Sequence, residues 1–374
     1  MKKTFLFVLA TLVLGSIVIT GCKKDKDQDE NPTGNIIPST FKVDIPDAIS
    51  HPFSGAKSVN YKGVMTDTIP GDVIYEHLAN FIYIGEEAAQ IIQDIMTFIA
   101  VYNINHPIDF TYTGEEDGRD KHMVVIENSS YDGINYEYQM TVTDADYEGN
   151  ADGGKAVQVF WNTSPVKGVA IIKPANFDVN SFAALTETMY RVDYSEAGEL
   201  DYEKYMVVYI ANLPLENPLT NPYSMQNLKM FAGKDGDVID VWGNSDHPNA
   251  KFYNDDVGFD WAFVASGIKT ENIGVAEVGI PRRTLDSSDR TALLVTNSIK
   301  NVLSAQIYEV WPTIDSASVE AYLHNTDAPG YFNSGGFVQG GASPGTQYDN
   351  IDSRLPGLSP YNPFSISNLS IEFK

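Results

Sequence analysis

"GDVIYEHLANFIYIGEEAAQIIQDIMTFIAVYNI", residues 71–104, is the stretch on which the expected fold depends. Pro70 precedes it and Pro107 follows it, at positions where helices commonly start and stop. Its apolar residues cover far more than one stripe, as in helices that are buried inside a large core. A helix lying on a membrane surface would carry lysine or arginine, and this stretch has neither. We therefore predict a largely buried helix, with these side chains inside: Ile82, Ile92, Ile95 and Ile99.

Most of the remaining chain consists of short alternating or aromatic-rich runs separated by turn residues, the pattern of an antiparallel meander. The 21 tyrosines and 18 phenylalanines also favour β structure. The predicted strands are 41–45, 58–65, 108–112, 122–127, 134–143, 155–162, 169–173, 188–194, 204–211, 237–242, 259–265, 273–280 and 369–373. Two further helices are expected at 288–310 and 316–324, followed by a Gly/Pro/Asn-rich loop over 326–363.

These elements predict a β-rich α+β fold: a curved antiparallel sheet or open barrel wrapped around a long apolar helix. Residues 41–374 are expected to form a single large globular domain, with a possible subdivision at the Pro/Asn-rich break near 212–224. In architecture alone, this arrangement resembles the half-barrel lipoproteins and carriers that handle lipid in the Gram-negative envelope. No motif supports that kinship, and a fold does not by itself define a function.

The first 40 residues have a different character. A cationic start (residues 1–3) precedes an apolar run over 5–18, which is shorter than the roughly 20 residues of a membrane-spanning helix. It has the length and flanks of a secretory signal peptide. The run ends in Ile19-Thr20-Gly21-Cys22, which resembles the lipobox of bacterial lipoproteins. The resemblance implies that residues 1–21 are removed and that Cys22, the chain's single cysteine, carries lipid.

Residues 22–40 are charged and then rich in Pro, Gly and Asn, so they are expected to form a flexible acidic tether. In Gram-negative lipoproteins, aspartate directly after the lipidated cysteine marks inner-membrane retention. Lys23 takes that position here, so the resemblance implies the outer membrane. The acidic residues that follow also resemble tracts that export some lipoproteins to the cell surface, which favours the surface over the periplasmic face. A plain solvated spacer is the alternative.

Composition excludes one class of function. With 50 acidic and 25 basic residues, the net charge is −25, and such a polyanion repels nucleic acid and anionic lipid headgroups.

Motifs for catalysis and metal binding are weak. The six histidines show no metal-binding spacing. Gly341–Gly345 reads G-x-S-x-G, but it lies in a Gly-rich loop with proline directly after the serine, unlike a nucleophile elbow. Residues 144–155 imitate a calcium loop, but Lys155 replaces the closing glutamate, so we expect a β-hairpin connection, with calcium as the alternative. We predict no metal site and no cofactor.

Aromatic residues are the remaining candidates for ligand contact. Trp161, Trp242, Trp261 and Trp311 lie in apolar patterns and are expected to be core residues, with stacking on sugars as the alternative. The aromatic residues of the Gly-rich loop are predicted to contact a ligand, because loops commonly carry function on a rigid scaffold. They are Tyr331, Phe332, Phe337 and Tyr348. The alternative is that they pin the loop to the body.

The sequence thus predicts an outer-membrane-anchored lipoprotein that is a non-enzymatic binding module for an apolar or glycan ligand. One alternative is a structural or accessory subunit of an envelope complex, which would expose a large apolar patch to a protein partner. Another is a hydrolase that uses acidic residues, which would hold two close carboxyls with raised pKa in a cleft.

Overall fold

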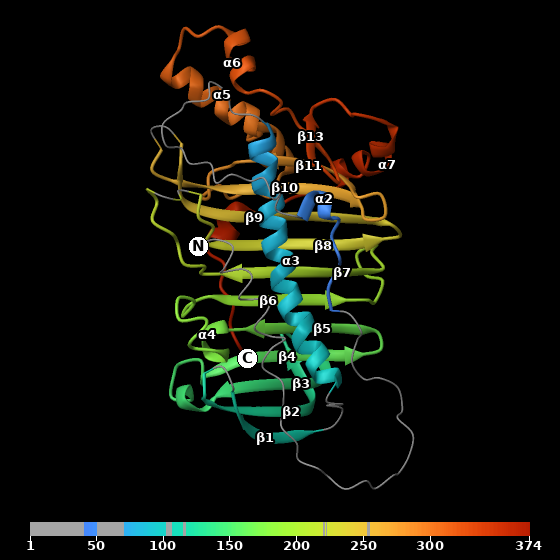
Figure 1. Ribbon diagram of the computed structural model, residues 1–374, viewed down its shortest axis with the longest axis vertical. Coiled ribbons are helices and arrows are strands. Elements are labelled where there is room, and N and C mark those ends of the chain that lie inside the picture. Colours follow the sequence, from blue (N-terminus) through green and yellow to red (C-terminus); the bar gives the residue numbers. More distant parts are fainter. Residues whose placement is uncertain are drawn as a thin grey trace. The chain divides into compact units, whose positions relative to one another are not determined.

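The computed structural model describes residues 41–50, 71–101, 107–114, 117–219, 221, 223–252 and 255–374. The signal peptide, Cys22, the tether and the expected strand 58–65 lie outside these residues. The protein is β-rich, as predicted: thirteen strands, β1 to β13, follow in chain order in an antiparallel sheet that is not closed (Figure 1). Among the described helices, none is long and apolar enough to cross a membrane.

The chain divides into two compact units. Of the described residues, unit 1 comprises those within 41–42, Glu87–Ala197 and Ile371–Lys374, and unit 2 those within Val43–Glu86 and Gly198–Ser370. The division after Ala197 precedes the Pro/Asn-rich break at 212–224.

Unit 1 contains six strands, each paired with the next. They are β1 (Ile108–Thr113), β2 (Asp120–Tyr131), β3 (Ile134–Asp144), β4 (Lys155–Thr163), β5 (Val166–Ile172) and β6 (Met189–Ser195). Asp132 and Gly133 join β2 to β3 with positive φ at both positions, the two-residue turn that matches strand twist. Residues 169–172 of β5 are all buried, so both faces of the sheet are covered there, as their apolar run predicts. The remaining elements are η1 (Ala145–Tyr147) and α4 (Pro174–Phe177).

Unit 2 contains the other seven strands: β7 (Lys204–Ala211), β8 (Asn227–Asp235), β9 (Val238–Lys251), β10 (Gly258–Ile268), β11 (Ile273–Gly279), β12 (Gly330–Asn333) and β13 (Gly336–Gly340). All residues of β10 are buried. The helical pieces of this unit are α2 (Asp47–Ser50), the π-helical η2 (Thr291–Thr296), α5 (Ile299–Val310), α6 (Ser316–Tyr322), η3 (Thr346–Tyr348), α7 (Asp349–Asp352), η4 (Leu355–Gly357) and α8 (Pro363–Ser367).

The expected long helix is present as α3 (Gly71–Val101), whose first half belongs to unit 2 and second half to unit 1. Ile82 and Ile92 are fully buried, whereas the side chains of Ile95 and Ile99 lie outside the described residues. The buried positions form one stripe with helical spacing: 71, 74, 75, 78, 79, 81, 82, 85, 88, 89 and 92. A single stripe is what a helix needs to pack on one face of a sheet. The structure therefore does not support the expectation that the sheet wraps around a helix apolar on all sides.

Several expected boundaries need correction. Residues 41–45 form no strand, although Phe41, Val43 and Ile45 are buried, and 369–373 form none either. The helix predicted over 288–310 is divided into η2 and α5, and strand β8 was not predicted. The expected loop over 326–363 is instead built from β12, β13 and four short helical pieces.

Candidate functional site

Unit 2 has a solvent-open cleft of about 390 Å³ between α5 and the segments that follow β9 and β11. Its walls combine polar and apolar groups, as small-molecule sites commonly do. The lining residues are Phe252, Asp255, Ile280, Arg282, Thr296, Asn297, Asn301, Val302, Ala305, Gln306 and Glu309.

Helix α5 presents one face to this cleft. Residues 302, 305, 306 and 309 are spaced by three and four, so they share a side of the helix. Leu303 and Ile307 lie on another side, where they pack with Val319 and Leu323 of the α6 region. Because α6 takes up the apolar side, the polar side of α5 stays open to solvent.

Hydrogen bonds within unit 2 fix the asparagines at the base of the cleft. The Asn297 Nδ2 donates to the Ala292 carbonyl at 2.7 Å, and the Asn301 Nδ2 donates to the Val295 carbonyl at 2.8 Å. Gln306 Oε1 is buried and has no hydrogen-bond partner among the described residues. Across from α5, Arg282 Nε lies 2.7 Å from Asp255 Oδ2. The polar lining of the cleft therefore combines three amide side chains and a threonine with the Asp255–Arg282 pair and a second carboxylate, that of Glu309.

Two carboxyls with raised pKa also occur in unit 2. Asp246 and Asp260 are opposite each other in the β9–β10 pair, and both are fully buried. Burial raises the pKa of both carboxyls, and for Asp260 the Asp246 charge adds to this effect. Arg283 binds Asp246 through two hydrogen bonds of 2.8 and 2.9 Å, and Asn244 donates to Asp260 at 2.5 Å. Two close carboxyls with raised pKa are what a hydrolase of this kind would need. However, this pair is buried in the core and is not among the residues that line the cleft.

The opposite face of the same strands holds a serine–histidine pair. Ser245 Oγ lies 2.8 Å from His247 Nε2, and His247 Nδ1 lies 3.1 Å from the Tyr223 carbonyl. This is the contact distance of a nucleophile and its base. However, His247 is fully buried, which lowers its pKa to about 3, and its ring packs on Phe81 of α3. The pair is thus a closed structural contact, which no sequence motif indicated.

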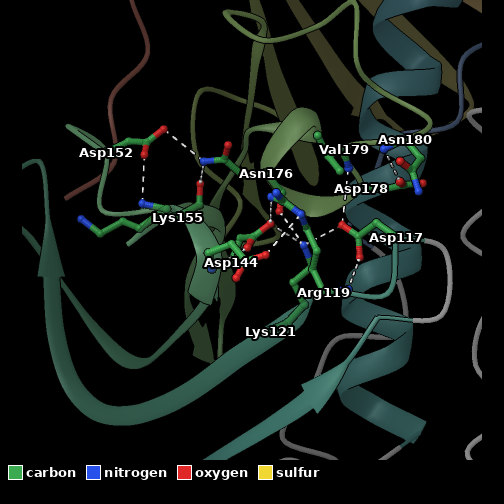
Figure 2. A network of polar contacts seen from close by, with 12 residues as sticks. Asp117, Arg119, Lys121, Asp144, Asp152, Lys155, Asn176, Asp178, Val179 and Asn180 are labelled. Carbon is green, nitrogen blue, oxygen red and sulfur yellow. Dashed lines mark hydrogen bonds and ion pairs between the residues drawn. The ribbon is translucent and has the colours of Figure 1, made fainter. Parts of the chain in front are cut away.

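In unit 1, a buried lysine is at the centre of a polar network, and its neighbours surround it in Figure 2. Lys121 Nζ donates to Asp117 at 2.9 Å, to Asp144 at 2.8 Å and to the Asn176 carbonyl at 3.0 Å. Arg119 donates to the same Asp144 oxygen at 3.1 Å. Burial alone would raise the pKa of Asp144, but hydrogen bonds from Lys121 and Arg119 outweigh that effect and lower it. The ammonium group therefore supplies the positive charge among these oxygens.

The same network includes the calcium-like stretch of residues 144–155 and shows how it is arranged. β3 and β4 pair antiparallel, so residues 145–154 connect a hairpin, as predicted. Asp144, at the first position of the calcium-like pattern, binds Lys121 and Arg119, while Asp152 accepts from Lys173 at 2.6 Å. Among the described residues, no group of three or more acidic, histidine or cysteine side chains is placed to hold a metal ion. The prediction of no tight metal site remains to be tested.

Three of the four loop aromatics proposed for ligand contact are buried: Tyr331, Phe332 and Tyr348. Tyr348 donates to the Phe332 carbonyl at 2.9 Å, and the rings of Tyr331 and Tyr348 meet edge to face at 5.2 Å. Phe337 is half-buried and stacks on Tyr75 of α3 at 4.9 Å. These contacts correspond to the alternative in which the aromatics pin the segment to the body.

The four tryptophans that were expected to be core residues differ in exposure. Trp161 and Trp261 are buried, and Trp242 stacks on Phe231 at 3.8 Å. Trp311, at the end of α5, is 55% exposed. Sequence reasoning singled out none of the cleft residues, because Asn, Gln and Thr in a helix have no pattern that distinguishes a cleft from an ordinary surface.

No protein-family model matches the chain, and neither a curated protein nor a solved structure matches it.

Proposed function

We propose that this protein is a lipid-anchored, non-enzymatic binding protein whose ligand occupies the cleft beside α5. The observation that carries the proposal is the cleft itself, an open hollow of about 390 Å³ whose lining residues are mostly polar. Its polar lining favours a glycan over the apolar ligand that is the other option. No enclosed apolar cavity is needed for such a ligand.

Hydrolysis is disfavoured by the position of the acidic pair. Asp246 and Asp260 are fully buried, Arg283 binds both oxygens of Asp246, and Asn244 donates to one oxygen of Asp260. A glycosidase needs an acid and a base that both reach the scissile bond. A substrate would have to displace the chain that covers these strands.

The membrane attachment is proposed from the sequence. Cys22 follows a short apolar run in a lipobox-like context, and Lys23 favours the outer membrane. Several acyl chains, at about 0.8 kcal/mol for each buried CH₂, anchor a protein stably where one chain is marginal. The finer fold, a sheet that curves around α3, is also a proposal. Its support is that no described side chain of α3 is fully exposed.

A structural role in an envelope complex is the second candidate, and one surface favours it. Tyr308 and Trp311, three positions apart at the end of α5, share a side of the helix, with exposed fractions of 38 and 55%. Exposed apolar groups that are adjacent in this way often mark a protein interface.

Two measurements test the proposal. Cells labelled with a clickable palmitate should incorporate label into the wild-type chain and not into Cys22→Ser, and equal labelling would refute the anchor. The full chain carrying Cys22→Ser is then tested for glycan and fatty-acid binding by calorimetry. Binding of either supports a binding module, whereas stable capture of an envelope protein without any small ligand would favour the structural role.

A further inference from the structure

The buried amine of Lys121 in unit 1 contacts two carboxyls at once, independently of the proposed ligand cleft. Lys121 Nζ lies 2.9 Å from Asp117 Oδ2 and 2.8 Å from Asp144 Oδ2, and Figure 2 shows the three side chains together. The lysine side chain is 2% exposed, and those of Asp117 and Asp144 are 1% and 0% exposed. A nucleophile, an electrophile and a base are thus held in contact and shielded from bulk water, which favours amide formation.

The two carboxyls have different surroundings, which give them different roles. Burial raises the pKa of Asp144, but hydrogen bonds from Lys121 and Arg119 outweigh it and hold the pKa below its ordinary value. As a carboxylate, Asp144 can take a proton from the amine at the contact distance that a general base needs. Asp117 Oδ1 instead accepts from the Arg119 backbone N–H at 3.1 Å, a donor placed to stabilise negative charge on that oxygen. The carboxyl carbon of Asp117 is therefore the electrophile.

The balance of charge supports the same assignment. As ions, the two cations Lys121 and Arg119 balance the two carboxylates. Condensing Lys121 with Asp117 removes one charge of each sign and leaves the Arg119–Asp144 pair intact. Buried ions are costly, whereas a neutral amide needs only its N–H satisfied, and the Asn176 carbonyl lies 3.0 Å from Nζ to accept it. Condensation with Asp144 would instead deprive Arg119 of its buried partner.

We propose that Lys121 and Asp117 condense to form an isopeptide bond, with Asp144 carrying the proton. A proton first moves from the ammonium to the Asp117 carboxylate, so that an amine faces a carboxylic acid. The Nζ–Cγ bond forms as Asp144 takes a proton from the nitrogen, and Asp144 returns this proton to Asp117 Oδ2 as the Cγ–Oδ2 bond breaks. One water leaves, nothing is oxidised or reduced, and Asp144 ends as a carboxylate. The bond ties the β1–β2 connection covalently to β2.

Mass spectrometry of the full chain carrying Cys22→Ser tests for this bond. The intact chain should be lighter than its sequence by one water, and trypsin, which still cuts after Arg119, should leave the Asp117 and Lys121 peptides joined. A succinimide at Asp117-Gly118 would also lose one water, but it would leave the two peptides separate. The full sequence mass, or separate peptides, would overturn the proposal.

Three substitutions distinguish the bond from an ordinary ion pair. Lys121→Arg keeps the charge and should show the full mass and separate peptides. Asp117→Asn should join the same two peptides with loss of one ammonia in place of one water, which a purely structural contact would not produce. Asp144→Asn should leave most chains unjoined, because a general base contributes about 100-fold or more in rate. Complete joining in Asp144→Asn would overturn the role assigned to Asp144.

Lys300 is the matched control within the same chain. Its Nζ lies 2.7 Å from Asp327 and 2.8 Å from Glu320, distances similar to those at Lys121, but these carboxyls are 50% and 59% exposed. Water stabilises the ions there, so the Lys300 peptide should remain unjoined, and a joined one would overturn the role of burial. Circular dichroism checks that each variant is folded, and the wild-type digest decides the proposal even where a variant is not.

Discussion

Buried titratable side chains carry the strongest single-residue effects in this protein. Asp260 is fully buried, and one of its oxygens has no hydrogen-bond partner among the described residues. Burial and the nearby Asp246 raise its pKa well above the ordinary value of 3.8. His247 shows the opposite shift, because burial lowers its pKa from 6.5 to about 3. Burial therefore favours the neutral form of each group.

The difference in the pKa of Asp260 between the folded and the unfolded chain determines whether stability rises or falls with pH. Above pH 3.8 the unfolded chain loses this proton while the folded chain keeps it, so the contribution of Asp260 to stability falls as the pH rises. Asp260→Asn removes the titration and keeps the shape. We expect the stability of this variant relative to wild type to increase as the pH rises above about 4, by up to about 1.4 kcal/mol for each pH unit. Urea unfolding at several pH values measures it.

Asp256→Asn is the matched control for the same chemical change at a fully exposed side chain. An Asp260→Asn variant that differs from wild type by a constant amount across this pH range would contradict the expectation. The opposite sign is expected of His247, whose contribution to stability is lost as the pH falls from 6.5 toward 3.

At the scale of elements, strand β9 explains why the C-terminal segment is ordered. Its even-numbered side chains share one face, and three of them bind the segment or its neighbours. Asp240 accepts from Arg354 at 2.6 Å, Asn244 accepts from the Tyr361 backbone at 2.7 Å, and Asp246 binds Arg283. Neighbouring Asn227 of β8 donates to the Ile366 carbonyl at 3.1 Å. A polar strand face is therefore buried under residues 354–366.

This arrangement shows what the sequence can and cannot predict. Strands with local alternation and clear turns, such as β2 and β3 around Asp132-Gly133, follow directly from the sequence. Residues 354–361 have no period because their partners are side chains of β9, more than a hundred positions away. Conversely, 369–373 alternates but pairs with no strand. The cleft depends on the same long-range packing, so its residues could not be selected from the sequence.

Arg354→Ala tests whether the polar side chains on this face of β9 hold the C-terminal segment in place. It leaves the buried Asp240 with Tyr202 and Ser266 as partners but without a cation. Removing one partner of a buried ion pair costs about 3–5 kcal/mol, and we expect about 3 kcal/mol because Arg354 is partly exposed. Limited proteolysis should then cleave within 341–360, a segment that we expect to be protected in the wild type. Lys251→Ala, at an exposed ion pair, should cost less than about 1 kcal/mol and leave the protection unchanged. Equal protection in both variants would show that the segment is held by apolar packing.

At the scale of the whole molecule, net charge and anchoring act together. The chain carries a net charge of −25, and such a protein gains no attraction from anionic headgroups. Acyl chains on Cys22 would supply the membrane affinity that the acidic body lacks. The tether of residues 22–40 would then let the body extend from whichever membrane face holds the lipid.

Proteinase K added to intact cells distinguishes the cell surface from the periplasmic face. We expect the wild-type chain to be digested while a periplasmic marker stays intact, because the acidic tract after Cys22 resembles a surface-export signal.

The matched variant replaces Asp25, Asp27, Asp29 and Glu30 with their amides. It keeps the length and polarity of the tether and removes only its negative charge. If the tract directs export, this variant becomes protected in intact cells and is digested after the outer membrane is permeabilised. If the tract is only a solvated spacer, wild type and variant are digested alike. Protection of the wild type itself would place the protein on the periplasmic face.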